Sequence, residues 1–66
     1  MTIAKIIELV GSSDEGWEDA ARNALTGAHK TLHGISGIEV VGWTASVEDG
    51  EITRYRATVK VAFRVD

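Results

Sequence analysis

Four basic side chains occupy one side of an alternating segment near the carboxyl end of the chain. They are Arg54, Arg56, Lys60 and Arg64. Because successive side chains of a β-strand point to opposite faces, this spacing predicts one basic strand face. Repeated around a symmetry axis, such a face predicts a pocket that attracts phosphate or carboxylate. The alternative is a solvated face whose charges pair with Glu8, Glu39 or Glu51.

Two groups of side chains have spacings that suit metal binding. His29 and His33 are four residues apart and present two imidazoles on one helix face, although the same residues complement a helix C-terminus. Four carboxylates offer oxygen ligands for calcium, but they equally suit the start of a helix, and the EF-hand spacing is absent. These four are Asp14, Glu15, Glu18 and Asp19.

Motifs for catalysis are missing from the sequence. It contains no cysteine, no serine in a nucleophile-elbow motif and no histidine with an obvious orienting carboxylate. The net charge of −3 disfavours nucleic acid as a partner. The apolar stretch 6–11 is interrupted by Glu8 and is too short to cross a membrane. We therefore expect a cytoplasmic binding protein, not an enzyme, with no membrane partner.

The length of the chain limits its stability. A domain of 66 residues removes only about 60% of its unfolded surface from water. Small domains compensate with disulfides, metals or association, and the lack of cysteine excludes disulfides. The sequence shows no linker, repeat or proline, so residues 1–66 are predicted to form one domain that associates with further copies.

The elements that position these residues follow from hydrophobic periodicity. Aliphatic residues predict an inner strand over 3–10, and a stripe of small apolar residues predicts a helix over 14–33. Ser12 and Glu15 have capping-box spacing, and Gly34 is a predicted C-cap. Two further strands, over 38–47 and 54–65, are joined by a tight turn at Asp49 and Gly50. The predicted class is α+β: β-α-β-β, with a three-stranded antiparallel sheet on one helix.

The second strand carries an unusual apolar pattern. If Ile38 and Val40 face the helix, alternation places Val41 and Trp43 on the opposite, solvent-facing side. An exposed apolar patch with a tryptophan predicts an oligomer interface. The alternative is a β-bulge near Gly42 that redirects the second half of the strand.

Three segments together resemble the dodecin family. They are IIELVGSS at 6–13, GWEDAA at 16–21 and YRATVKVAFR at 55–64. The resemblance spans essentially the whole chain. It implies a hollow homo-dodecamer of β-α-β-β subunits that binds and stores FMN or riboflavin.

Two positions depart from the family pattern. The resemblance expects a ring-stacking tryptophan where Gly37 stands and a hydrogen-bonding glutamine where Arg56 stands. Glycine cannot stack on a ring, and arginine favours phosphate or carboxylate. The predicted ligand site comprises Gly37, Arg56, Arg54 and Glu39. The predicted ligand is a flavin, bound in a site that differs from the family pattern at two of these positions. The alternatives are another phosphate-bearing ligand such as coenzyme A, or a structural or ion-binding (calcium) dodecamer without flavin.

Overall fold

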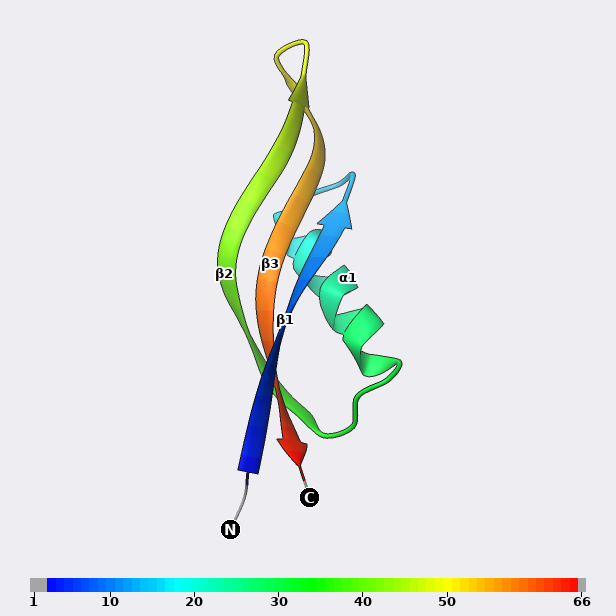
Figure 1. Ribbon diagram of the computed structural model, residues 1–66. Coiled ribbons are helices and arrows are strands. Elements are labelled where there is room, and N and C mark those ends of the chain that lie inside the picture. Colours follow the sequence, from blue (N-terminus) through cyan, green and yellow to red (C-terminus); the bar gives the residue numbers. More distant parts are fainter. Residues whose placement is uncertain (1–2, 66) are drawn as a thin grey trace.

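The computed structural model describes residues 3–65 and contains one helix and three strands (Figure 1). Strand β1 spans Ile3–Ser13, helix α1 Trp17–His29, strand β2 Ile35–Glu48 and strand β3 Glu51–Val65. All pairings are antiparallel, and α1 packs on one face of the sheet. The predicted β-α-β-β architecture with one covering helix is confirmed.

The order of strands differs from the prediction in one respect. The sheet runs β1-β3-β2, so β3 is central and β1 is an edge strand, whereas the sequence predicted an inner position for β1. The prediction was wrong because apolar residues on both faces of a strand do not require that both faces are covered within the subunit. Ile6 and Val10, which lie on the face away from α1, are instead 60% and 62% exposed.

The helix is shorter at both ends than the predicted 14–33. Ser12 and Ser13 still pair with β3, so the predicted capping box does not form. The Ser13 hydroxyl instead accepts a hydrogen bond from the backbone N–H of Glu15 (2.9 Å) and donates one to Asp19 Oδ2 (2.6 Å). No helix in the described residues has the length and apolar content needed to cross a membrane.

The C-terminal end of α1 also differs from the prediction. The C-cap is Lys30, and Gly34 belongs to the turn that leads into β2. Its φ of 71° lies in the left-handed region, which explains the glycine there without a capping role.

The fully buried core is small and consists largely of alanine. The buried apolar residues on α1 meet those of the central strand, and their short side chains bring the helix close to the sheet. The core residues are Ala20, Ala21, Ala24, Ala28, Ala57, Val59 and Val61. Gly11 on β1 is where backbone and helix come closest: a Cβ built there would lie 2.8 Å from Ala24 Cβ.

A β-bulge in β2 confirms the alternative proposed for that strand. Val40 pairs with Val59, and the next paired residue is Gly42, which faces Thr58, so Val41 is the extra residue. Trp43 then pairs with Ala57, a core residue on the helix side. The placement of Trp43 on the face away from α1 was therefore wrong, because alternation continues only in a regular strand.

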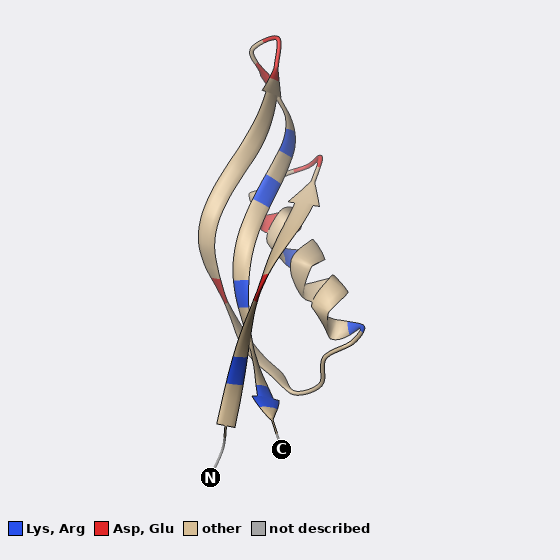
Figure 2. Cartoon of the chain, viewed as in Figure 1, with Lys and Arg blue, Asp and Glu red and all other residues tan. Residues whose placement is uncertain are grey.

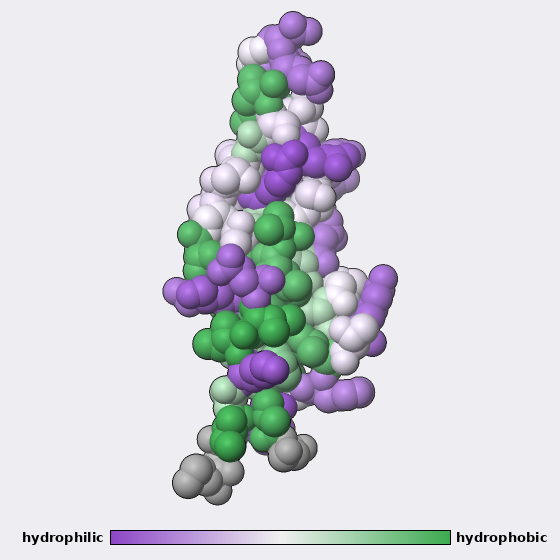
Figure 3. Space-filling model, viewed as in Figure 1, coloured by the Kyte–Doolittle hydropathy of each residue, from purple (hydrophilic) through white to green (hydrophobic). Residues whose placement is uncertain are grey.

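The β2–β3 hairpin gives the molecule an elongated shape. Asp49 and Gly50 both have positive φ, 51° and 77°, as a two-residue hairpin turn of the predicted type requires. The chain measures 52 × 19 × 13 Å, and its radius of gyration of 13.5 Å exceeds the roughly 11 Å of a compact domain of this length. Figure 3 shows hydrophobic surface in the middle of the molecule and again below the hairpin tip.

We predict that Gly11→Ala destabilises the fold by about 1–3 kcal/mol, because the added methyl group collides with the Ala20 carbonyl and with Ala24. Gly27→Ala is the matched control: its Cβ meets nothing within 4 Å, and alanine favours the helix by about 0.5–1 kcal/mol. Denaturant unfolding followed by circular dichroism measures both. Equal midpoints for the two variants would remove the close approach at Gly11 as a constraint.

Candidate functional site

The face of the sheet turned away from α1, hereafter the outer face, carries the predicted basic residues. Directly paired residues of antiparallel strands share a face, so each β3 position defines a row across the sheet. Figure 2 shows blue segments spaced along β3. The outer-face residues of β3 are Arg54, Arg56, Thr58, Lys60, Ala62 and Arg64.

Lys60 lies between two carboxylates. It pairs with Glu8 of β1 on one side and with Glu39 of β2 on the other, and Figure 2 shows this as a blue segment flanked by two red ones. Such cross-strand pairs of opposite charge contribute roughly 0.2–1 kcal/mol each. The register therefore places two glutamates opposite Lys60, without an ion pair within 4.0 Å among the described residues.

A hollow of about 240 Å³ lies beside this row, at Gly37. Ala62 pairs with Ile6 of β1 on one side and with Gly37 of β2 on the other. This row lies next to the row of Lys60 on the outer face, and at its β2 end there is no side chain. A Cβ at Gly37 would meet nothing within 4 Å. The lining residues are Ile6, Gly37, Ile38, Glu39, Lys60 and Ala62. The structure thus brings Gly37 and Glu39 together around an apolar floor with a charged rim.

Arg54 and Arg56 form a second group, nearer the hairpin tip. Arg56 Nη2 donates a 2.7 Å hydrogen bond to Ser46 Oγ, which orients its guanidinium along β2. Arg54 Nε lies 3.6 Å from Asp14 Oδ1, and both side chains are more than half exposed. The carboxylate beside Arg54 is therefore Asp14, not one of the three glutamates considered from the sequence.

The two groups are far apart within one subunit. Gly37 pairs with Ala62, whereas Arg56 pairs with Thr44, and positions 56 and 62 on β3 are about 20 Å apart at roughly 3.3 Å per residue. One ligand of ordinary size does not contact both groups on the same chain. A site that uses Gly37 and Arg56 together therefore needs residues from two copies.

Trp43 lies near the start of α1, beside Trp17. The Trp17 indole Nε1–H donates to the Thr44 carbonyl oxygen at 2.9 Å, and its ring meets Tyr55 edge-on with centroids 4.8 Å apart. A hollow of about 410 Å³ lies between the two tryptophans. Trp43 remains 52% exposed and Val41 44% exposed, so both predicted interface residues are accessible in the single chain.

The predicted metal-binding groups do not converge. Helix α1 ends at His29, so His33 lies beyond it and the two imidazoles do not share a helix face. Of the carboxylates, Asp14 lies beside Arg54, Asp19 accepts from Ser13, and Glu18 pairs with Arg22 at 2.7 Å. Within residues 3–65, no three histidine or carboxylate side chains gather at one point.

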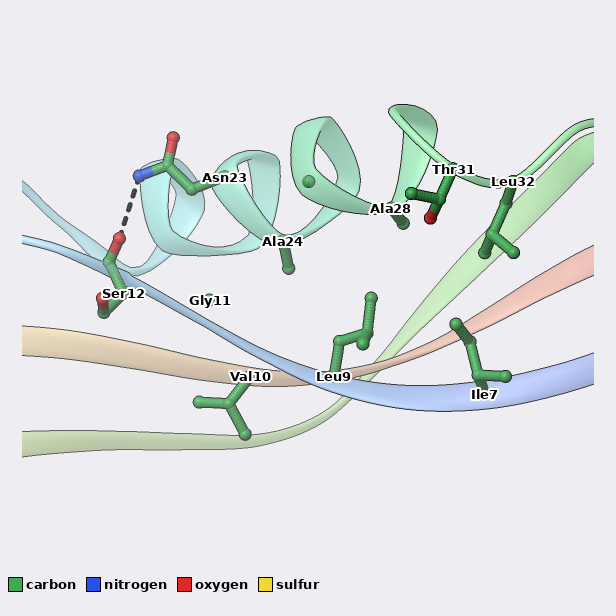
Figure 4. A pocket seen from close by; sticks show the side chains of 11 residues that line it. Ile7, Leu9, Val10, Gly11, Ser12, Asn23, Ala24, Ala28, Thr31 and Leu32 are labelled. Atoms are coloured by element: carbon green, nitrogen blue, oxygen red, sulfur yellow. Dashed lines mark hydrogen bonds between the residues drawn. The ribbon is translucent and has the colours of Figure 1, made fainter.

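The sequence did not reveal a groove between α1 and β1 (Figure 4). It measures about 400 Å³, and Ile7, Leu9 and Leu32 point into it. At one end Asn23 Nδ2 donates to the Ser12 carbonyl at 2.9 Å. The remaining lining residues are Val10, Gly11, Ala24, Gly27, Ala28 and Thr31. The sequence feature that could have indicated this groove is the run of small residues at helical spacing. These residues line the groove as well as the core.

Comparisons with known proteins agree with this architecture. A sequence model of the dodecin family matches residues 3–66. The chain is 34% identical over 64 residues to the dodecin of Thermus thermophilus, covering 97% of this chain and 93% of the relative. It is 28% identical over 65 residues to the calcium dodecin of Mycobacterium tuberculosis, with coverage of 98% and 92%.

A solved structure supports the same relationship. The dodecin from Streptomyces davaonensis superposes with a TM-score of 0.94 at 37% sequence identity, covering 98% of this chain and 96% of that one. Fold, sequence and length therefore agree along the whole chain. The chain belongs to the dodecin family.

Proposed function

We propose that this protein is a homo-dodecamer that binds and stores a small ligand bearing a flat ring and a phosphate, and that FMN is the first candidate. Family membership supports the assembly and the binding role. The observation that carries the ligand proposal is the apolar hollow at Gly37 on a face that also presents Arg56. The protein acts by binding, not by catalysis, in the cytoplasm, without nucleic acid or membrane as a partner.

The two groups of the outer face have separate tasks in this proposal. The hollow beside Gly37 has an apolar floor of Ile6 and Ala62, and the missing side chain lets a ring lie against the backbone. Arg56 of a second copy supplies a charge-assisted hydrogen bond to the phosphate. Arg54 adds positive charge beside it, and Glu39 lines the rim of the hollow.

The departures from the family pattern determine the ligand preference. Stacking of a ring on an aromatic side chain contributes about 1–3 kcal/mol, and Gly37 removes that contribution. Arg56 adds affinity for phosphate instead of for the ring edge. We therefore expect FMN to bind more tightly than riboflavin, and coenzyme A to be the main competing ligand.

The second candidate function is a structural or ion-binding dodecamer that has lost flavin binding. Two observations favour it: the open space at Gly37, which leaves a ring without a stacking partner, and the ion pair that occupies Arg54. The name of the M. tuberculosis relative, calcium dodecin, makes calcium the first ion to test.

Removing Arg56 should lower FMN affinity on the order of 10- to 100-fold and leave riboflavin affinity nearly unchanged, because only FMN has a phosphate to lose a charge-assisted contact. Equilibrium dialysis of Arg56→Ala with each flavin measures both constants. Arg22→Ala is the control, since Arg22 lies on α1 and pairs with Glu18. A parent dodecamer that retains neither flavin at micromolar concentration contradicts the flavin proposal.

Restoring both family residues distinguishes the two candidate functions. Gly37→Trp has free space for the added side chain, and together with Arg56→Gln it should create or strengthen riboflavin binding by at least tenfold. If the parent binds FMN tightly and the double variant reverses the preference toward riboflavin, the altered-site proposal is supported. Flavin binding that appears only in the double variant supports the ion-binding or structural candidate.

Replacing Trp43 by glutamate should dissociate the assembly at micromolar concentration, because an unpaired carboxylate is costly to bury in an apolar contact. Size-exclusion chromatography with light scattering measures the mass. Thr26→Glu adds the same charge on the exposed side of α1 and should keep the parent mass. A Trp43→Glu protein of full mass would remove Trp43 from the interface.

A further inference from the structure

Two tryptophans line a hollow at the start of α1 that the proposed ligand site does not use. Trp43 pairs with Ala57, a core residue on the helix side of β3, whereas the proposed site lies on the outer face. The hollow measures about 410 Å³, and the side chains that line it are those of Trp17 and Trp43. Trp17 is 37% exposed and Trp43 52% exposed. The hollow therefore offers a ligand two accessible indole rings and almost no polar group.

The Trp17 ring is held in place by contacts within the chain. Its indole N–H donates to the carbonyl oxygen of Thr44, which follows Trp43 on β2. Its ring meets Tyr55 of β3 edge-on, with an angle of 80° between the two ring planes. These contacts tie the start of α1 to both strands of the hairpin. A wall that is already in position loses little conformational freedom when a ligand binds.

The two segments that meet beside the hollow are negatively charged. Residues 14–22 contain Trp17 and residues 48–56 contain Tyr55, and together they hold seven carboxylates and three arginines, a net charge of −4. Arg22 pairs with Glu18, and Arg54 and Arg56 lie on the outer face, across the sheet from the hollow. Figure 2 shows red at the hairpin tip and in the loop that leads into α1. This charge attracts cations to the hollow and repels anions.

The chemistry of the walls selects among cations. An inorganic ion would lose water in the hollow without gaining oxygen or nitrogen ligands, and that loss is costly. A quaternary ammonium group has no N–H to satisfy and carries methyl groups that suit an apolar wall. Indole is the aromatic side chain that attracts such a cation most strongly. The walls and the surrounding charge therefore favour the same class of ligand.

We propose that Trp17 and Trp43 bind an organic cation of the quaternary ammonium class, with its methyl groups against the two indole rings. The site lies within one chain and on the helix side of the sheet, so it goes beyond the proposed function and does not depend on flavin binding. It requires that a copy packed on Trp43 leave the side toward Trp17 open. Binding is therefore measured on particles of the parent mass.

Choline and its uncharged isostere 3,3-dimethylbutan-1-ol test the proposal, because they differ in charge and hardly in shape. The chain has two tryptophans, so protein labelled with 5-fluorotryptophan gives two fluorine NMR resonances, which single tryptophan variants assign. Choline should shift both resonances in a saturable manner. The isostere should bind about 5-fold or more weakly, since it lacks the cation–π attraction.

Two outcomes of this titration would overturn the proposal. The first is the absence of a saturable shift at choline concentrations of tens of millimolar, which would show that the hollow is closed by a neighbouring copy or has no affinity for the cation. The second is equal affinity for choline and the isostere, which would show that the hollow is only an apolar surface. Both readings come from the parent protein and do not depend on the folding of a variant.

A pair of substitutions at Trp17 isolates the contribution of the ring. Trp17→Phe and Trp17→Leu both lose the hydrogen bond to Thr44, but only the phenylalanine keeps an aromatic wall. Trp17→Leu should bind choline about 3- to 10-fold more weakly than Trp17→Phe, with nearly equal affinity for the isostere. Isothermal titration calorimetry measures the constants, and circular dichroism with light scattering confirms fold and mass. Equal choline affinity in the two variants contradicts the role of Trp17.

Discussion

The close packing of α1 on the sheet is the constraint on which the rest of the structure depends. Gly11 and the four alanines of α1 allow the helix to approach β1 and β3, and this gives a dense but very small core. A larger core would need larger side chains, which this spacing excludes. The chain therefore gains little stability from its own interior, and its apolar surface elsewhere has to be covered by other copies.

The residues of the proposed ligand site do not meet within one subunit. Gly37 pairs with Ala62, six residues along β3 from Arg56, and both rows lie in the three-stranded part of the sheet, where Ile6 and Ser12 of β1 complete them. Within one chain, Lys60 lies between two glutamates and Arg54 lies beside Asp14. A ligand that contacts both Gly37 and Arg56, as we propose, therefore depends on the assembly of several copies.

Much of the fold was predictable because it depends on local pattern. The alternation along β3 and the Asp49–Gly50 turn follow from strand and turn geometry, and both are present. The position of Trp43 was not predictable in the same way. A single extra residue at Val41 reverses every later side chain of β2, and whether a bulge forms depends on pairing with β3, which the sequence of β2 alone does not specify.

The helix ends and the site also combine features that follow from local sequence pattern with features that depend on tertiary packing. Ser12 stays in β1 because its pairing with Arg56 competes with capping of α1, and the spacing of the capping-box motif does not include that competition. Gly37 and Glu39 were predicted together and do lie together, since they are two residues apart on one strand. The groove between α1 and β1 was missed because it depends on how far the helix lies from the strand edge.

Native mass spectrometry over a dilution series, with circular dichroism on the same samples, tests most directly whether this fold needs its neighbours. We expect particles of twelve copies that pass on dilution to unfolded chain, because one subunit buries too little apolar surface to remain folded alone. A folded monomer that persists across the series, with unchanged circular dichroism, would contradict it.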